Sequence, residues 1–305
     1  MKLLKQLYLI YSPSHHENRM SDFVQSQLDG MNIKYKTNGN IIYSIKKNTP
    51  LICAHMDQVS NYPIIKVKQK KDIVYSDGNL GADDKNGIWI CLNLLKQFPD
   101  ISFIFSDQEE IGGNITELLW KYRDILKSVK YGLIFDRKNG ADIVCSQNRY
   151  GTKKFEKALS KTGKFYGYIP AIGSWSDCDE LSNYISCCNL SCGYYKPHTA
   201  QEYTKFSELN NALQYGIAIL NNITKQYGPV ENRWGKKTSK KHTDTYNLFN
   251  DDFDDGFTEP HTGTEIESDY FYCDNCDSYF TLEEIGFNEV CPYCNCFLRK
   301  FKDVI

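Results

Sequence analysis

Five short polar stretches of the sequence contain residue types that could together bind metal ions. Three of them follow apolar, strand-like runs, one is rich in glycine, and the last precedes a long amphipathic segment. Imidazole and carboxylate groups are ligands that zinc uses in catalytic sites. The residues of these stretches that could do chemistry are His55, Asp57, Asp83, Glu109, Glu110, Asp136 and His198.

The first stretch is LICAHMDQV, residues 51–59. Its apolar start predicts a buried strand that delivers His55, with Asp57 two residues later. A zinc-bound imidazole needs its second ring nitrogen held by an acceptor, and Asp57 is well placed to provide one. A histidine and an aspartate at this spacing do not identify a metal site by themselves.

The second stretch, SDGNLGADDKNG, spans residues 76–87. Its glycines permit a tight turn that points the carboxylate of Asp83 into a cleft. Two other interpretations remain open at this point. Asp84 could be the N-cap of the helix that follows, and adjacent aspartates in a glycine-rich loop could form a calcium or magnesium site.

The third and fourth stretches are FIFSDQEEIGG and YGLIFDRKNG. Glu109 and Glu110 follow an apolar strand, where neighbouring carboxylates repel each other unless cations separate them or one is protonated. Asp136 also ends a buried apolar run. Open α/β sheets bind ligands at the carboxyl ends of their strands, so we expect these acids to meet His55 and Asp83 there.

The fifth stretch, HTAQEYTKF, begins with His198. Taken alone, His198 would be interpreted as a histidine at the entry to a helix. Beside the four upstream stretches, we expect it to supply a second imidazole ligand. His15, His16, His242 and His261 lack such surroundings and are not expected to bind metal.

The elements that must position these residues alternate along the first 225 residues. Such alternation predicts an α/β fold with a mixed, mainly parallel central sheet flanked by helices. Apolar spacing predicts helices at 17–28, 86–98 and 206–223, and apolar or alternating runs predict strands at 32–37, 40–46, 51–54, 101–106, 131–135 and 186–193, with a turn at Gly39.

The bulk composition agrees with a packed globular protein of 305 residues. The net charge of −2 argues against a body-wide nucleic-acid surface. The start MKLLKQLYLIYSPS lacks a long apolar core and a cleavage site, and no apolar run reaches the ~18 residues of a membrane span. We therefore expect a cytoplasmic protein without membrane contact, whose seven cysteines in the first 192 residues are reduced core thiols.

The amino-acid composition of the chain changes near residue 228. A basic patch, RWGKKTSKK, precedes the acidic run NDDFDDGFTEPHTGTEIESD, which has too little apolar surface to fold. We predict a catalytic domain at 1–228, a flexible charged linker at 229–269 and a small module at 270–305.

The terminal module carries two Cys-x-x-Cys pairs separated by fourteen residues. Two such pairs can form a tetrahedral four-sulfur shell, which suits a structural zinc ion. A segment this short has little core of its own, so metal binding would supply stability. The module resembles a zinc ribbon, and its expected ligands are Cys273, Cys276, Cys291 and Cys294, with Cys296 left unassigned. A role in docking another protein is left open.

The polar stretches resemble those of the co-catalytic di-zinc exopeptidases, most of all the peptidase T branch of the aminoacylase/carboxypeptidase clan. The matching stretches are HMDQV, SDGNLGADDKNG, SDQEEIGG, the Phe-Asp pair at 135–136 and PHTAQEY, in the family's order and spacing; YSPSHHE at 11–17 resembles the family's amino-terminal helix entry. The resemblance implies a zinc-dependent exopeptidase or amidohydrolase.

The resemblance also implies a role for each matching residue. His55, Asp83 and Asp136 would hold one zinc, and His198, Asp83 and Glu110 the other, with Asp83 bridging. Glu109 would be the general base and Asp57 would orient His55. Cobalt or manganese could replace the two catalytic zinc ions, since this ligand set does not exclude them. The implied substrate is a short peptide or an N-acyl amino acid.

The sequence departs from the clan in one respect. Only 61 residues separate Asp136 from His198, which leaves no room for the lid domain that many members insert there. The family's lid residues therefore have no counterpart, and the terminus attacked is not determined. Ser176 and Asp177 resemble a turn near the site of lidless relatives, although an ordinary helix cap is an equal alternative.

A different class of function is also compatible with the motifs. The body could be a non-catalytic peptidase-fold scaffold whose zinc ribbon binds a protein or nucleic-acid partner. Such a scaffold would be expected to lose a ligand or the base, and this sequence keeps all of them. The acidic run before the ribbon also argues against nucleic acid.

Overall fold

The structure is a computed structural model that describes residues 1–60 and 62–231 and, near the carboxyl end, residues 270–273, 278–281 and 299–300. The chain divides into two compact units, Met1–Ser239 and Lys240–Ile305. Each unit is described by itself.

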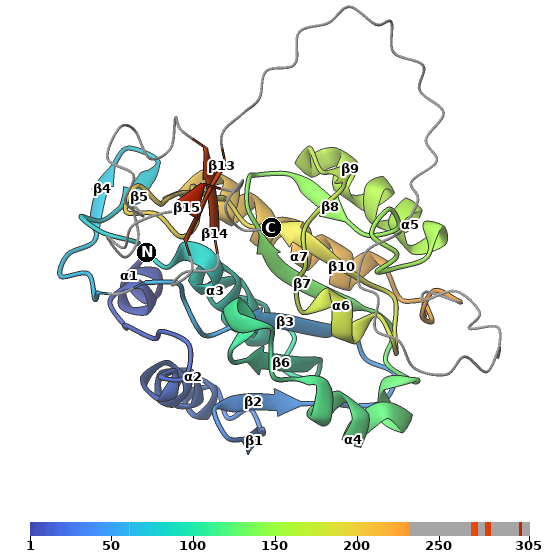
Figure 1. The fold of residues 1–305 in the computed structure, drawn as a ribbon. Helices are drawn as coiled ribbons and strands as arrows, with labels where there is room; N and C mark the ends of the chain where they lie inside the picture. Colours follow the sequence, from blue (N-terminus) through green and yellow to red (C-terminus); the bar gives the residue numbers. More distant parts are fainter. Residues whose placement is uncertain (61, 232–269, 274–277, 282–298, 301–305) are drawn as a thin grey trace, which may run out of the picture. The chain divides into compact units, whose positions relative to one another are not determined.

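A central sheet of eight strands organises the first unit, in the order β1-β2-β6-β3-β7-β10-β8-β9 (Figure 1). Its middle strands β6, β3, β7 and β10 run parallel, while β2 pairs antiparallel with β6 and β8 pairs antiparallel with β10. The strands are β1 (Lys36–Asn38), β2 (Ile41–Ser44), β3 (Leu51–His55), β6 (Ser102–Ser106), β7 (Gly132–Arg137), β8 (Asp142–Val144), β9 (Ile169–Ala171) and β10 (Cys187–Ser191). The predicted mixed, mainly parallel sheet is confirmed.

Helices cover both faces of this sheet. One face packs against α1 (Lys2–Tyr8), α2 (Asn18–Gly30), α3 (Ala82–Gln97), α5 (Lys153–Gly163) and α7 (Phe206–Asn222), and the other against α4 (Thr116–Leu126) and the short α6 (Cys178–Leu181). The predicted helices at 17–28, 86–98 and 206–223 correspond to α2, α3 and α7. The amphipathic spacing of α2 and α7 places their apolar residues in the core, whereas α3 is buried on nearly every side.

The buried strands divide their side chains between two apolar cores. Phe103 and Phe105 of β6 join the core beneath α3 and α7, whereas Ile104 joins the core beneath α4 and α6. Strands β3 and β7 alternate in the same way. Because both faces of a central parallel strand are covered, its sequence is a continuous apolar run instead of an alternating one.

A second, smaller sheet was not expected from the sequence. Its order is β11-β12-β5-β4, formed by β4 (Lys68–Lys70), β5 (Ile73–Tyr75), β11 (Tyr194–Tyr195) and β12 (Tyr203–Lys205). β12 pairs with β5 antiparallel, with Thr204 opposite Val74. This pairing brings the segment that carries His198 close to the loop that leads into α3.

No lid domain is inserted between Asp136 and His198. Residues 137–197 are all described and form only β8, α5, β9, α6, β10, β11 and a short 3-10 helix at Lys164–Tyr166. The prediction that this stretch contains no lid domain is therefore confirmed.

The second unit contains a small antiparallel sheet, β14-β13-β15, formed by β13 (Tyr270–Cys273), β14 (Ser278–Thr281) and β15 (Arg299–Lys300). Cys273 is the last residue of β13. The other predicted ribbon ligands, Cys276, Cys291 and Cys294, lie outside the described residues, as does most of the predicted linker at 229–269.

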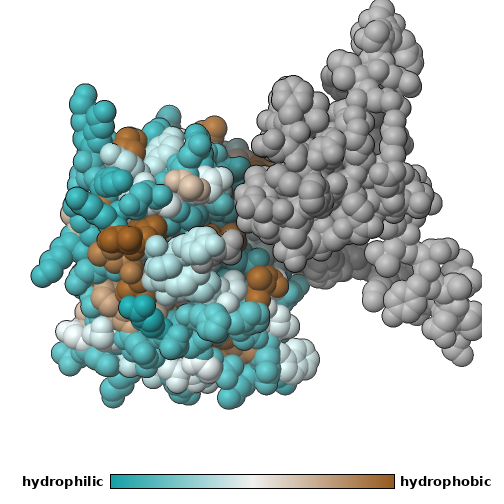
Figure 2. Space-filling view, turned by 60° about the vertical axis from the view of Figure 1, so that its left-hand side comes forward, coloured by the Kyte–Doolittle hydropathy of each residue, from teal (hydrophilic) through white to brown (hydrophobic). Residues whose placement is uncertain are grey.

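Hydrophilic residues cover much of the visible surface of the first unit, with hydrophobic residues in separate patches between them (Figure 2). Among the residues that the structure describes, no helix has both the length and the apolar character needed to cross a bilayer. The seven cysteines of this unit are buried and free, as predicted for core thiols.

Candidate metal centre

The carboxyl ends of β3, β6 and β7 bring the predicted residues together. His55 ends β3, lies opposite Ser106 of β6, and is 1% exposed. Its Nε2 atom lies 3.2 Å from Asp83 Oδ1, 3.5 Å from Asp136 Oδ1 and 3.8 Å from Glu109 Oε2. Three carboxylates therefore surround one imidazole nitrogen, which is an arrangement that a cation would stabilise.

Asp83 lies between the two histidines. While its Oδ1 faces His55, its Oδ2 lies 3.3 Å from His198 Nε2. His198 Nε2 is also 3.1 Å from Glu110 Oε1. The two imidazoles, 143 positions apart in the sequence, thus share one carboxylate. His198 itself has a φ of 62°, a left-handed conformation that non-glycine residues rarely adopt.

The backbone at the start of α3 positions Asp83. Gly81 has a φ of 64°. Asp83 and Asp84 have non-helical backbone dihedral angles, and the peptide bond between these two residues is cis. Buried Glu202 accepts hydrogen bonds from Gly81 N at 2.6 Å and Asp83 N at 3.2 Å. Its carboxylate therefore fixes the loop from which the shared aspartate projects.

Asp84 is placed differently from its neighbour. Its Oδ1 accepts a hydrogen bond from Gly87 N at 2.9 Å, as an N-cap would, and its Oδ2 accepts one from His55 N at 3.3 Å. The N-cap interpretation of Asp84 therefore describes one of its two contacts. The other contact links α3 to the end of β3.

Asp57 joins the end of β3 to the turn that carries the two glutamates. Its Oδ1 lies 3.2 Å from His55 Nδ1 and accepts a hydrogen bond from Glu109 N at 3.0 Å. Its Oδ2 accepts hydrogen bonds from Ser14 Oγ at 2.7 Å and Glu110 N at 3.2 Å. Both carboxylate oxygens are thus occupied, and Asp57 is fully buried.

Asp136 is held by the neighbouring strand β10. Its backbone N–H donates to Asn189 Oδ1 at 3.0 Å, and its carbonyl accepts from Asn189 Nδ2 at 3.1 Å. The hydroxyl of Tyr194 lies 3.3 Å from the same carbonyl. These contacts fix the backbone of Asp136, so that its side chain can face His55.

The electrostatics of the cluster reflect its crowded acids. Burial and the charge of Asp136 raise the pKa of Glu109 to about 10, and burial and the charge of Asp83 raise the pKa of Asp136 to about 8. Burial alone would lower the pKa of His198, but its hydrogen bonds with Asp83 and Glu110 raise it to about 11. Excess negative charge of this kind favours the binding of cations.

The donor set suits zinc. Ligand atoms of His55, Glu109 and Asp136 lie within 4.8 Å of one another, and so do those of His55, Asp83 and Glu110. Adding His198, which faces Asp83 and Glu110, gives two overlapping groups of nitrogen and oxygen donors. Imidazole and carboxylate are the ligands of catalytic zinc sites. Calcium sites use oxygen ligands only, so the two histidines argue against calcium here.

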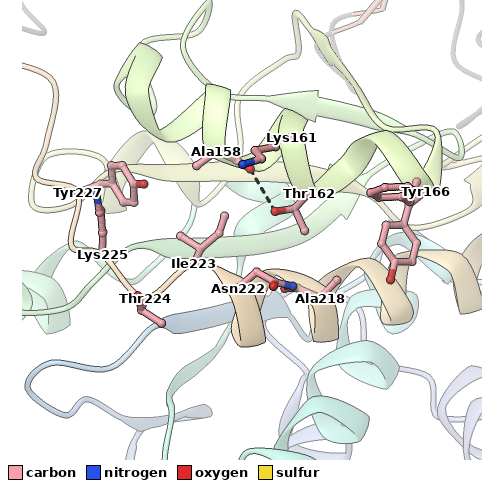
Figure 3. A pocket seen from close by; sticks show the side chains of 11 residues that line it. Ala158, Lys161, Thr162, Tyr166, Ala218, Asn222, Ile223, Thr224, Lys225 and Tyr227 are labelled. Carbon is pink, nitrogen blue, oxygen red and sulfur yellow. Dashed lines mark hydrogen bonds between the residues drawn. The ribbon is translucent and has the colours of Figure 1, made fainter.

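A small pocket of about 130 Å³ opens beside this cluster. Its walls include Asp83, Asp136 and His198, so the pocket and the cluster form one site. A larger hollow of about 560 Å³ lies between α5 and the end of α7 (Figure 3). The eleven residues that line it include no Asp, Glu, His or Cys, so it offers no metal ligands.

The structure brings together all seven predicted residues of the di-metal site. Ser176 and Asp177 are buried, and Asp177 Oδ2 accepts hydrogen bonds from Ser106 Oγ at 2.5 Å and Cys53 Sγ at 3.4 Å. Neither of them lines the small pocket, whose wall contains Gly173 and Ser174 from the same segment. His15 and His16 are exposed and lie outside the cluster, whereas His242 and His261 lie outside the described residues.

Sequence reasoning missed the residues that support the cluster. Glu202, Asn189 and Tyr194 were not singled out, although each holds the backbone of a candidate ligand. Glu202 lies only four residues after His198 and could have been noticed as a second acid near that histidine. Asn189 is an amide inside an apolar run, CCNLS, which is itself a signal for a buried polar role.

The chain is similar in fold to several solved peptidases. Aminopeptidase PepT from Bacillus cereus aligns with a TM-score of 0.58 at 15% identity, over 73% of this chain and 98% of that chain. A tripeptidase from Staphylococcus aureus aligns with a TM-score of 0.58 at 13% identity, over 73% and 97%. An aminopeptidase from Desulfurococcus kamchatkensis aligns with a TM-score of 0.54 at 13% identity, over 72% and 93%.

The sequence matches no protein-family model and no curated protein. At identities of 13% to 15%, the structural likeness concerns the fold alone. The chain therefore shares with these solved peptidases an α/β fold that has a mainly parallel central sheet flanked by helices.

Proposed function

We propose that this protein is a metallo-exopeptidase that hydrolyses the terminal amide bond of short peptides. The observation that carries the proposal is the position of Asp83, whose two carboxylate oxygens face His55 and His198 respectively. A carboxylate shared between two imidazoles is the arrangement that a co-catalytic pair of metal ions requires. The likeness in fold to solved aminopeptidases and a tripeptidase supports the same activity.

In this proposal, His55, Asp83 and Asp136 hold one zinc ion, and His198, Asp83 and Glu110 hold the other. Cobalt or manganese could occupy the same ligands. When bound, a pair of such ions lowers the pKa of a water molecule toward ~7 and polarises the scissile carbonyl.

Glu109 is the proposed general base. Its Oε2 is 3.8 Å from His55 Nε2, and Glu109 is buried beside the cluster. There it can accept a proton from the attacking water and donate it to the leaving amine. Burial and the charge of Asp136 raise the pKa of Glu109 to about 10. Cations in the cluster would offset that negative charge and lower this pKa, so that the carboxylate can be ionised and act as a base.

Asp57 is the proposed orienting residue. Its carboxylate and its backbone carbonyl lie 3.2 Å and 3.1 Å from His55 Nδ1, so they favour a proton on that nitrogen. The Nε2 atom is then left free to bind a metal ion, which is how carboxylates support zinc-bound histidines.

The terminal module is proposed to be a zinc ribbon that holds one structural zinc ion through Cys273, Cys276, Cys291 and Cys294. Its two Cys-x-x-Cys pairs support this assignment. A protein partner for the module remains a proposal of the same kind, since small ribbons commonly present a docking surface.

Activity profiling with defined metals tests the proposed function. The full-length protein is stripped with a chelator, reloaded with zinc, cobalt or manganese, and incubated with peptides that have a free or a blocked amino terminus. An aminopeptidase cleaves only the free set. Hydrolysis of neither set with any metal would contradict the proposal.

A substitution of the proposed general base separates the hydrolytic step from the binding of metal. Glu109→Gln should keep its metals but lower kcat by about 10²–10⁴-fold, because general-base catalysis contributes an effect of that size. Glu117→Gln makes the same change at an exposed position of α4 and should leave kcat unaltered. Turnover by Glu109→Gln at the rate of the unaltered protein would remove Glu109 as the base.

A further inference from the structure

The small pocket beside the cluster has both acidic and basic side chains in its walls. Its charged residues are Asp83, Asp136, Arg137, Lys138 and His198. Asp83, Asp136 and His198 are already engaged with one another and with His55. The chemistry of the pocket as a binding site therefore depends on the two cations that remain.

Arg137 is committed to neighbouring groups. Its Nε atom lies 3.1 Å from Asp142 Oδ2, and its Nη2 donates to the carbonyl of Ile172 at 3.4 Å. Lys138 differs in this respect. Among the described residues, its ammonium makes no hydrogen bond, ion pair or cation–π contact, although it belongs to the wall of the pocket.

The backbone of Lys138 is nevertheless fixed in place. Ser191 Oγ donates to the carbonyl of Lys138 at 2.7 Å and accepts from Asp142 N at 3.0 Å. The anchoring strand β10 is also the strand that holds Asp136. The lysine is therefore kept two residues beyond a candidate metal ligand, with only its side chain free to move.

The size of the pocket limits what can bind there. A volume of about 130 Å³ is far below the ~300–1,000 Å³ of sites for drug-sized ligands, and equals about four water molecules. Gly173 allows the backbone of the wall to lie close to Val144, because a Cβ atom at residue 173 would lie 2.8 Å from the Cγ atoms of Val144. The pocket suits a terminal group or one short side chain.

We propose that Lys138 makes this pocket a carboxylate subsite, so that the enzyme selects short peptides with a carboxylate next to the metal centre. This inference rests on the proposed peptidase function. Lys138 is exposed at the wall of this pocket, where an unpaired ammonium attracts a carboxylate and disfavours a second cation. The carboxylate can be the terminus of a dipeptide or the side chain of an acidic residue.

Binding measurements on the zinc-loaded, full-length Glu109→Gln protein test the subsite without turnover. The probes are Ala-Ala, Ala-Ala amide and Glu-Ala amide, whose dissociation constants are compared by calorimetry. We expect at least one carboxylate-bearing probe to bind roughly fivefold more tightly than Ala-Ala amide, which is the upper range for a solvent-accessible ion pair. Tighter binding of Ala-Ala would indicate that the subsite takes a terminal carboxylate, and tighter binding of Glu-Ala amide that it takes a side-chain carboxylate.

Adding Lys138→Gln should abolish that preference. Lys47→Gln, a matched loss of charge in an exposed turn outside the pocket, should keep it. Equal preference with and without Lys138, or failure of the carboxylate probes to bind, would overturn the inference. Either result differs from failure of the proposed peptidase function. In that case, the protein without substitutions would bind these peptides but hydrolyse none of them.

Discussion

At the scale of single residues, the site depends on carboxylates that have different tasks despite identical chemistry. Asp83 faces two imidazoles, Asp57 accepts backbone and side-chain hydrogen bonds, and Glu202 is used entirely by the backbone beneath Asp83. Burial and partners, not residue type, decide these tasks. The sequence alone could predict the first two residues because their stretches match a known pattern, but Glu202 matches no pattern.

Asp57→Asn should weaken the metal centre without unfolding the protein. The amide keeps only one acceptor oxygen, so it cannot serve both the His55 ring and the N–H groups of Glu109 and Glu110. We expect metal affinity about 10–100-fold lower, as is typical for the loss of a group that supports a ligand. Competition with a coloured chelator measures this affinity.

The matched control for that variant is Asp22→Asn, at an exposed position of α2. It should leave metal affinity unaltered. If Asp57→Asn bound metal as tightly as the control, its contacts with His55 would not be holding the ligand in place.

At the scale of elements, the central strands could be predicted and the second sheet could not. Residues 51–54 and 103–105 are continuous apolar runs, and they form buried strands because helices cover both of their faces. By contrast, β5 and β12 have three residues each and pair across 130 positions of sequence, with Thr204 opposite Val74. Local periodicity carries no information about so short and distant a pairing.

The contact between α3 and β7 sets a strict limit on side-chain size. A Cβ atom on Gly87 would lie 2.6 Å from the carbonyl oxygen of Phe135 and would also meet the Asp84 carboxylate. Gly87→Ala should therefore destabilise the fold by about 1–3 kcal/mol, through overpacking. A urea unfolding curve measures the change as a lower midpoint.

Gly30→Ala is the matched comparison for that curve. Gly30 lies at the end of α2 with nothing within 4 Å of an added Cβ atom, so the substitution should be neutral or stabilising by up to about 1 kcal/mol. A lower midpoint for Gly30→Ala than for Gly87→Ala would contradict this account of the α3–β7 contact.

At the scale of the whole molecule, the chain has two compact units of very different length. The first contains two large apolar cores on either side of its sheet. The second is some 65 residues long, and its described part is a three-stranded sheet that ends at Cys273 on one strand. Small units of this kind generally need a metal ion or cross-links for stability.

The zinc content of the full-length protein should reflect this division. We expect about three zinc ions per chain, two in the di-metal centre and one in the ribbon. Cys276→Ser should lose one of them, as measured by elemental analysis, while peptide hydrolysis by the first unit continues. A chain that binds a single zinc ion, lost in this variant, would favour the non-catalytic scaffold.

The burial of all seven cysteines in the first unit has a practical consequence. Burial raises the pKa of the thiols of Cys53, Cys91, Cys145, Cys178, Cys188 and Cys192, so they are poor nucleophiles in the native protein. An alkylating reagent added under native conditions would then leave these thiols of the first unit unmodified. Modification that mass spectrometry finds on cysteines of the second unit would therefore test whether zinc protects the ligands proposed for the ribbon.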